Sequence, residues 1–409
     1  MSSQIKNKKI ALITTWYPPI NGIAVNRMNA FANYLSEKFE VEVFCLGKQN
    51  ETVSLNSNLK VHYTPSNRLF ELLKSNTKDN KIVHNGKTAL RVLLKKIVSN
   101  PLNSWKNQTL NKLKKRHSDN KFDLIISSYS PEESHLVAIE FCKIYGDVKW
   151  IADMRDEMSS NPYISLALKN SLKQIESEVN TYASAILSVS KPILDEFRLI
   201  CPDVHYFEEI RNGFDHELVF ENTELSPDKV FNLGYFGSFY GSRKPDFVLE
   251  SLAVLKNEYP DYCFHFHIYG AHNNYSIPSI LKDNIFKHQG LPYLEAIIEM
   301  NKMDANILIH PRSKHKGVFS GKIFDYISAK KTVLAFVDKD DVAADLIREY
   351  NCGYVAEFDI LSENKQILLN AFEDKMKGEF KIASDADILK LHRTNQINIL
   401  SELIIKLTI

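Results

Sequence analysis

The sequence VFNLGYFGSFYGSRKPDFVLESLAVL, residues 230–255, joins an apolar run to a glycine-containing loop and then to a stretch with helical spacing. Residues 230–236 predict a buried strand, and residues 244–258 predict the helix that follows it. The loop between them contains Gly237, Ser238, Arg243 and Lys244. Because backbone N–H groups at a helix N-terminus and two cations attract negative charge, the loop predicts a diphosphate site. The alternative is a flexible loop whose basic side chains are solvated.

The residues after this unit repeat its pattern. Apolar runs predict strands at 262–269, 305–309 and 332–336, and helical spacing predicts helices at 293–301, 323–329 and 341–350. Such alternation is typical of a doubly wound parallel sheet. We therefore expect residues 206–384 to form a Rossmann-like domain. Residues 385–409 predict one or two C-terminal helices that pack back toward the N-terminal domain.

The first half of the chain shows the same alternation. Strands are predicted at 9–15, 41–46, 61–64, 122–127, 149–152 and 185–189, and helices at 24–38, 132–144 and 171–183. Residues 1–205 therefore predict a second Rossmann-like domain. Open α/β sheets bind ligands at the carboxyl ends of their strands, so we expect two α/β domains that face each other across a cleft.

The charge of the chain is unevenly distributed. Its 51 Lys+Arg and 50 Asp+Glu give a formal net charge of +1, which argues against a dedicated nucleic-acid binder. Residues 68–121 alone carry 14 basic and 3 acidic side chains. Within them, residues 91–97 and 110–116 mix Leu, Ile and Val with Lys, a composition typical of an amphipathic helix on anionic lipid. The alternative is a solvated basic face.

The cysteines and the apolar runs bear on the compartment. Five cysteines lie far apart without a CxxC pair, which predicts a reducing compartment and neither a disulfide framework nor a zinc site. The N-terminus has no signal-peptide pattern, and the sequence contains no apolar stretch of transmembrane length. We expect a cytoplasmic protein, held at the inner face of the cytoplasmic membrane by its basic segment.

Two loops of the first half follow predicted strands and carry polar side chains. Residues 16–27 (WYPPINGIAVNR) include Asn21, Gly22 and Asn26, which predict a place for an anion or a sugar hydroxyl; the alternative is a plain strand–helix turn. Residues 153–156 (DMRD) supply Asp153, Arg155 and Asp156, and the alternative there is a solvated loop with a local ion pair.

Residues 310–325 (HPRSKHKGVFSGKIFD) form the most basic loop of the second half. Lys316, Ser320, Gly321 and Lys322 precede or open the next helix, where the backbone could approach a phosphate. Asp325 follows in the first turns and could accept hydrogen bonds from vicinal ribose hydroxyls, although it could also simply complement the helix dipole. The sequence contains no P-loop, GxSxG, HExxH or GxGxxG motif, which disfavours several other chemistries.

Taken in order, these segments resemble the retaining glycosyltransferases of the GT-B fold, family 4. The resemblance is carried by YPPINGIAVNRMNAFANYL, WIADMRDE, ASAILSVSKPILDEF, IRNGFD, GYFGSFYGSRKPDFVLESLAVL, HQGLPYLEAIIEMNKMDANILIHP and GKIFDYISAKKTVLAF. Their order and spacing cover most of the chain. The N-terminal loop has one glycine where that family usually has two.

The resemblance implies roles for individual residues. Arg243 takes the place of the family's phosphate-binding lysine, Ser238 replaces the preceding arginine, and Asp325 takes the place of the second acidic residue of an E-x7-E pair. The first would fall at Gly317, so donor contacts shift to Lys316 or to the backbone around Ser320. The other implied roles are sugar contact by Arg155, a catalytic position for Asp153, diphosphate contact by Lys322, base contact by Leu291, and cleft positions for Asn212 and Asp156.

The reaction that the resemblance implies is sugar transfer from a nucleotide-diphosphate sugar with retention, without a metal or other cofactor. The acceptor would be a polysaccharide or a polyprenyl-diphosphate-linked glycan in surface-glycan biosynthesis. Two alternatives share the fold: a nucleotide-sugar 2-epimerase and a non-catalytic subunit that regulates a partner. The absence of the first acidic residue of the E-x7-E pair motivates the non-catalytic alternative.

Overall fold

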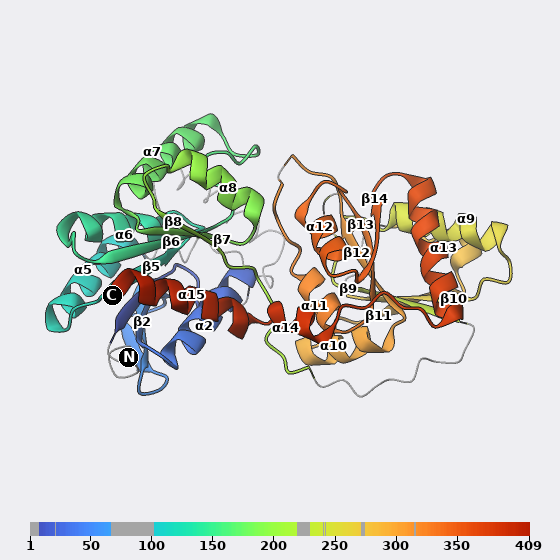
Figure 1. Cartoon of the computed structure of the whole chain (residues 1–409), viewed down its shortest axis with the longest axis horizontal. Helices are drawn as coiled ribbons and strands as arrows, with labels where there is room; N and C mark the ends of the chain where they lie inside the picture. Colours follow the sequence, from blue (N-terminus) through green and yellow to red (C-terminus); the bar gives the residue numbers. More distant parts are fainter. Residues whose placement is uncertain are drawn as a thin grey trace, which may run out of the picture. The chain divides into compact units, whose positions relative to one another are not determined.

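The protein is described by a computed structural model that covers residues 8–20, 22–66, 102–218, 230–239, 241, 243–270, 275–314 and 316–409. Asn21 and residues 67–101 of the basic segment lie outside these ranges. The chain divides into an N-terminal unit, residues 1–210 with 397–409, and a C-terminal unit, residues 211–396. Each unit is a parallel sheet with helices on both faces (Figure 1). The prediction of two doubly wound α/β domains is confirmed.

The N-terminal unit contains an eight-stranded sheet in the order β3-β4-β2-β1-β5-β6-β7-β8. Its strands are β1 (Lys9–Ile13), β2 (Glu40–Gly47), β3 (Glu51–Ser54), β4 (Leu59–Pro65), β5 (Leu124–Ser128), β6 (Lys149–Arg155), β7 (Ala185–Ser188) and β8 (Tyr206–Glu209). All pairs are parallel except β3 with β4. The chain winds outward in both directions from β1, so the switch point of this sheet lies between β1 and β5.

Helices cover both faces of this sheet (Figure 1). They are α2 (Ile23–Ser36), α5 (Asn103–Asp119), α6 (Glu133–Ile144), α7 (Leu166–Tyr182), α8 (Lys191–Ile200) and α15 (Arg393–Thr408). α2 buries Met28, Phe31 and Leu35 in the same core cluster as Leu400 and Ile404 of α15. The last helix of the chain therefore completes the core that the first helix begins.

A buried carboxylate on β2 ties α5 to the sheet. Glu42 of β2 has no exposed surface and accepts hydrogen bonds from Arg116 (2.6 and 2.9 Å). The Lys9 ammonium lies 3.0 Å and the His62 ring nitrogen 2.8 Å from its oxygens. These partners outweigh the desolvation of the carboxylate and hold its pKa well below the usual range.

The amphipathic pattern of residues 110–116 is explained by this packing. Leu110 and Leu113 of α5 are buried in the protein, at 6% and 0% exposure. They cannot enter a lipid layer without leaving the core, so the hypothesis that their apolar face docks on a membrane is wrong. Residues 91–97, the other half of that hypothesis, lie outside the described residues.

The C-terminal unit contains a six-stranded, wholly parallel sheet in the order β11-β10-β9-β12-β13-β14. Its strands are β9 (Phe231–Phe236), β10 (Phe264–Tyr269), β11 (Ile285–His288), β12 (Ala305–His310), β13 (Thr332–Val337) and β14 (Gly353–Glu357). The switch point lies between β9 and β12. The two loops predicted to bind a diphosphate follow these two strands.

Two helical layers cover this sheet. One core cluster joins α9 (Asp246–Glu258) and α13 (Leu361–Lys377) to one face, and the 3-10 turn η1 (Ser279–Leu281) extends it. A second cluster joins α10 (Tyr293–Lys302), α11 (Lys322–Ser328), α12 (Val342–Glu349) and α14 (Asp385–Lys390) to the other. The apolar periodicity of both strands and helices is accounted for by this burial.

The motif IRNGFD anchors the chain just before α15. Phe214 forms an isolated bridge with His392, and its carbonyl accepts the Arg393 N–H (3.0 Å). The Arg393 guanidinium pairs with Asp215. A Cβ atom on Gly213 would lie 2.1 Å from the Leu391 carbonyl oxygen, so only glycine permits this approach.

We predict that Gly213→Ala lowers the free energy of unfolding by about 1–3 kcal/mol, because the added methyl group forces the backbone at Leu391 away. Gly146→Ala is the matched control, since nothing lies within 4 Å of a Cβ there and we expect a change within about 0.5 kcal/mol. Urea unfolding of both variants measures the difference. Equal stability of the two would show that the contact at Gly213 relaxes at no cost.

Candidate functional site

Two glycines lie at the carboxyl edge of the C-terminal sheet. Gly237 follows β9 and donates its N–H to Tyr269 O (2.8 Å), and Gly270 follows β10 and donates to His288 O (3.1 Å). Their φ angles are 128° and 136°, in a region that L side chains rarely adopt. A Cβ on Gly270 would lie 2.4 Å from the Gly237 carbonyl oxygen. Both positions therefore require glycine, because of their φ angles and of the close approach of other parts of the chain.

The ammonium group of Lys322, the first residue of α11, lies against Gly237. A Cβ atom on Gly237 would lie 2.7 Å from Lys322 Nζ. The ammonium donates to the Tyr235 hydroxyl (2.9 Å) and lies 4.2 Å from the centre of that ring. Burial and the nearby charge of Arg243 lower the pKa of Lys322 to about 8. An anion at this point would relieve both effects.

Arg243 approaches the same place from the loop after β9. Its Nη2 donates to Nδ1 of His310, the last residue of β12, at 3.4 Å. The predicted residues Gly237, Arg243 and Lys322 are thus brought together at the switch point. Ser238 contributes its carbonyl, which accepts the Tyr235 hydroxyl at 3.4 Å, and Lys244 is exposed beside Arg243.

Asp325 lies one turn further along α11 in a short hydrogen-bonded chain. The Tyr293 hydroxyl donates to Asp325 Oδ1 (2.9 Å), so His216 Nδ1, 3.2 Å from the same hydroxyl, is its donor. Burial raises the pKa of the Asp325 carboxyl to about 6. Sequence reasoning found Asp325 but missed Tyr293 and His216, which come from other segments.

Two other basic side chains of this loop have acidic partners. Lys316 pairs with Asp338, and Arg312 with Glu357 at 3.0 Å. The role predicted for Lys316 at the donor therefore requires it to leave an ion pair. Ser320 is buried at 8%, and Gly321 is the N-cap of α11, a helix of only seven residues.

A pocket of about 670 Å³ lies at the ends of β10 and β11 and against α10. It is lined by Tyr269, Lys287, His288, Gln289, Leu291, Glu295, Ile298 and Glu299. Tyr269 stacks between Phe236 (4.6 Å between ring centres) and His288 (4.3 Å), and its hydroxyl donates to Glu299 (3.0 Å). The wall of the pocket combines aromatic rings with carboxylate oxygens, a combination that suits a planar ligand. The predicted base-contact residue Leu291 lines it.

Asp153 is part of a buried ion pair in the N-terminal unit. Its carboxylate has no exposed surface and is held by Arg27 of α2, with Nε–Oδ2 3.0 Å and Nη2–Oδ1 2.8 Å. Ser128 Oγ donates a third bond (2.9 Å), and Arg27 also donates to Ile210 O (2.7 Å). Arg27 and Ser128 enclose its oxygens, so the predicted contact of Asp153 with the substrate would require one of these bonds to break and stays a prediction.

Arg155, two residues on, is the last residue of β6 and follows a bulge. The register of β6 with β7 shifts between Asp153 and Arg155, and Arg155 has a φ of 50°, a strained value for a side-chain-bearing residue. Its guanidinium lies 3.3 Å from Asp156, whose side chain is partly exposed. The bulge therefore presents Arg155 at the carboxyl edge while Asp153 stays buried.

The other predicted positions of the N-terminal loop are open. A Cβ on Gly22 would meet nothing within 4 Å, and its φ of 163° is extended backbone that any residue adopts. Asn26 is exposed on α2, and Asn21 lies outside the described residues. Asn212 is half-buried in the motif that precedes β9.

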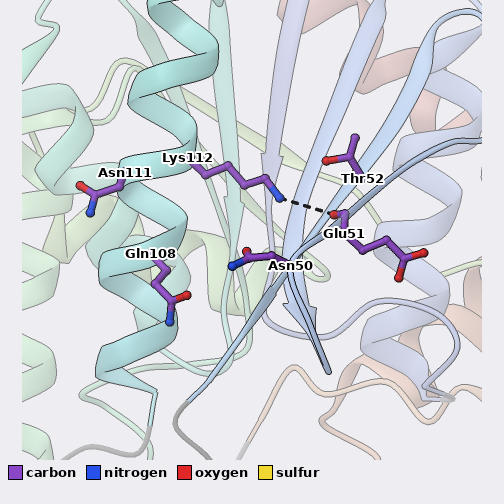
Figure 2. Close-up of a pocket in the computed structure, with 6 residues that line it drawn as sticks. All are labelled: Asn50, Glu51, Thr52, Gln108, Asn111 and Lys112. Atoms are coloured by element: carbon purple, nitrogen blue, oxygen red, sulfur yellow. Dashed lines mark hydrogen bonds between the residues drawn. The ribbon is translucent and has the colours of Figure 1, made fainter.

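A second pocket, of about 410 Å³, lies between β3 and α5 in the N-terminal unit (Figure 2). Asn50, Glu51, Thr52, Gln108, Asn111 and Lys112 line it. Figure 2 shows the Lys112 ammonium reaching across to the Glu51 carbonyl, at 3.4 Å. Because Tyr63 O also accepts from it (3.3 Å), this cation serves to join α5 to the sheet edge.

The described residues contain neither a cluster of metal ligands nor a membrane-spanning helix. In the ranges given above, no three His, Cys, Asp or Glu side chains are grouped so that they could hold a metal ion. Likewise, no described helix combines the length and apolar character needed to cross a bilayer.

Comparison with known proteins gives structural likeness only. No family model and no curated protein sequence matches the chain. Among solved structures it resembles sucrose-phosphate synthase from Thermosynechococcus elongatus (TM-score 0.62, 11% identity, 98% of this chain and 99% of that one). It also resembles Anabaena HepE in complex with UDP (0.62, 13%, 98% and 100%) and the lipopolysaccharide outer core galactosyltransferase WaaB (0.58, 14%, 97% and 99%). These likenesses show that the chain has the GT-B fold.

We predict that Asp153→Ala lowers the free energy of unfolding by about 3–5 kcal/mol, because it leaves the Arg27 guanidinium buried without its carboxylate. Asp156→Ala, at a partly exposed carboxylate, is the control and should cost less than about 1 kcal/mol. Denaturant unfolding followed by circular dichroism measures both. An Asp153→Ala protein that is as stable as the parent would refute the structural role.

Proposed function

We propose that the protein is a glycosyltransferase that moves a sugar from a nucleotide-diphosphate sugar to a saccharide acceptor. The observation that carries the proposal is the convergence of Lys322 and Arg243 beside Gly237, at the switch point of the C-terminal sheet. A diphosphate leaving group gains negative charge as the glycosidic bond breaks. Fixed cations stabilise that charge more in the transition state than in the ground state.

The neighbouring features suit the rest of a nucleotide. Asp325 uses Oδ1 for Tyr293, which leaves Oδ2 for a ribose hydroxyl. The pocket beyond Tyr293, lined by Tyr269, His288 and Leu291, has aromatic and apolar surface for a base. Anabaena HepE was solved with UDP and with UDP-glucose, which makes uridine nucleotides the first ligands to test.

The finer parts of the proposal follow the resemblance in sequence. Transfer proceeds with retention, Arg155 contacts the transferred sugar, and no metal is required because Lys322 and Arg243 supply the positive charge. The acceptor is a growing surface polysaccharide or a polyprenyl-diphosphate-linked glycan, and the reaction takes place at the cytoplasmic face of the membrane.

A thermal-shift panel of UDP-, GDP-, CMP- and dTDP-sugars tests the proposal directly. A ligand that binds only the folded protein raises its melting temperature in proportion to ln(1 + [L]/Kd). We expect one nucleotide class to raise it, followed by slow hydrolysis of that donor. Interconversion of nucleotide sugars would instead identify an epimerase, and binding without turnover a regulatory subunit.

We predict that affinity for the nucleotide sugar is highest between about pH 6 and pH 8. Above pH 8 the Lys322 ammonium loses its proton, and below pH 6 the Asp325 carboxylate gains one, so affinity falls on both sides. The two phosphates of a nucleotide sugar keep their charge throughout, so calorimetric titration reports the protein groups. Lys322→Arg should flatten the alkaline side and Asp325→Asn the acid side. A wild-type affinity that is constant across this range would contradict both assignments.

We predict that Arg243→Ala reduces kcat/KM for donor hydrolysis by about 30- to 150-fold, the equivalent of about 2–3 kcal/mol for a charge-assisted phosphate contact. Lys244→Ala is the matched control, because that neighbouring side chain is exposed, and it should change the rate by less than about threefold. Steady-state release of the nucleoside diphosphate measures both. Equal losses would mean that the loop contributes only diffuse positive charge.

A further inference from the structure

The segment that opens α7 carries apolar side chains that the protein leaves in solvent. Tyr163 is 65% exposed, Leu166 74% and Leu168 38%, and they stand within six residues of one another. Because α7 follows β6, this segment lies at the carboxyl edge of the N-terminal sheet, next to Arg155. Exposed apolar side chains so close together are uncommon on a soluble surface and mark a contact with another apolar phase.

The exposed segment is held in a defined shape. Ser165 caps α7 and accepts the Leu168 N–H (3.3 Å), and Asn161 Oδ1 accepts the Tyr163 N–H (2.9 Å). At the base of the loop, the Ser159 N–H is held by the buried Glu176 carboxylate (2.9 Å). The local hydrogen bonds therefore fix the apolar side chains outward instead of letting the loop fold them away.

The charges within the segment are all of one sign. Residues 162–175 contain no acidic side chain, and their two charged residues are Lys169 and Lys173. On a helix these lie three and seven residues beyond Leu166, on the same face, about 4.5 and 10.5 Å along the axis. With the tip about 5–10 Å deep in a bilayer, lysines at that distance reach the phosphate groups of the lipids.

We infer that residues 163–168 are an insertion tip that enters an anionic lipid surface, with Lys169 and Lys173 at the headgroups. Tyrosine suits the boundary between headgroups and acyl chains, since it has an apolar body and a polar hydroxyl. The tip takes the place of the membrane contact expected from residues 110–116, whose leucines are buried. Its purpose, to bring the carboxyl edge beside Arg155 to a lipid-linked acceptor, rests on the proposed function.

The test is co-sedimentation of the full chain with vesicles of phosphatidylcholine, with and without phosphatidylglycerol. We expect binding to the anionic vesicles and at least a fivefold lower bound fraction for Leu166→Asp. Leu199→Asp is the matched control: Leu199 is 84% exposed near the end of α8, at the opposite edge of the sheet, and should bind like the parent. Lys169→Glu with Lys173→Glu should lower binding to anionic vesicles.

Several outcomes would contradict the assignment of residues 163–168 as an insertion tip. These are absence of binding by the parent chain, equal binding by Leu166→Asp, or an equal loss in Leu199→Asp. A parent dimer that Leu166→Asp converts to a monomer, with no change in vesicle binding, would show a second copy of the chain to be the partner. The nucleotide-sugar thermal shift of each variant is a separate readout, so failure of the tip and failure of the proposed reaction are distinguishable.

Discussion

The ion pair between Arg27 and Asp153 sets the arrangement of the carboxyl edge of the N-terminal sheet. It joins α2 to β6 across 126 residues, and Arg27 also binds the carbonyl of Ile210, where this unit ends. Two buried charges in such contact are costly to separate, since either alone would remain desolvated. The first turns of α2, the end of β6 and the exit from the unit are therefore fixed together, and the bulge that presents Arg155 begins at this pair.

The sequence predicted the fold class because the central strands are continuous apolar runs. β1, β2, β5, β12 and β13 are buried on both faces, and their residues show it directly. The missed strands, β3, β8, β11 and β14, are edge or near-edge strands of four or five residues with mixed polarity, such as YFEE and IFKH. Their pairing depends on a neighbouring strand, so no local pattern announces them.

The candidate site was predictable only for residues that follow the carboxyl ends of the central parallel strands. Arg243, Lys322 and Asp325 follow two adjacent parallel strands, so their loops had to meet at the switch point. Tyr235 and Tyr293 could not be found in this way, because they reach Lys322 and Asp325 from 87 and 32 residues away and look like ordinary apolar positions. The ion pairs of Asp153 and Lys316 were missed for the same reason: their counterions, Arg27 and Asp338, come from other segments.

Composition shows where charge lies along a chain, but burial decides what that charge can do. α5 is rich in lysine and leucine, yet its leucines face the core and Arg116 is committed to Glu42. The start of α7 carries only two lysines, but its leucines point into solvent. An amphipathic pattern predicts that one helix face is buried without saying what buries it. Where the protein itself supplies the apolar partner, the pattern gives no evidence for a membrane contact. Such a contact is indicated only where apolar side chains remain exposed.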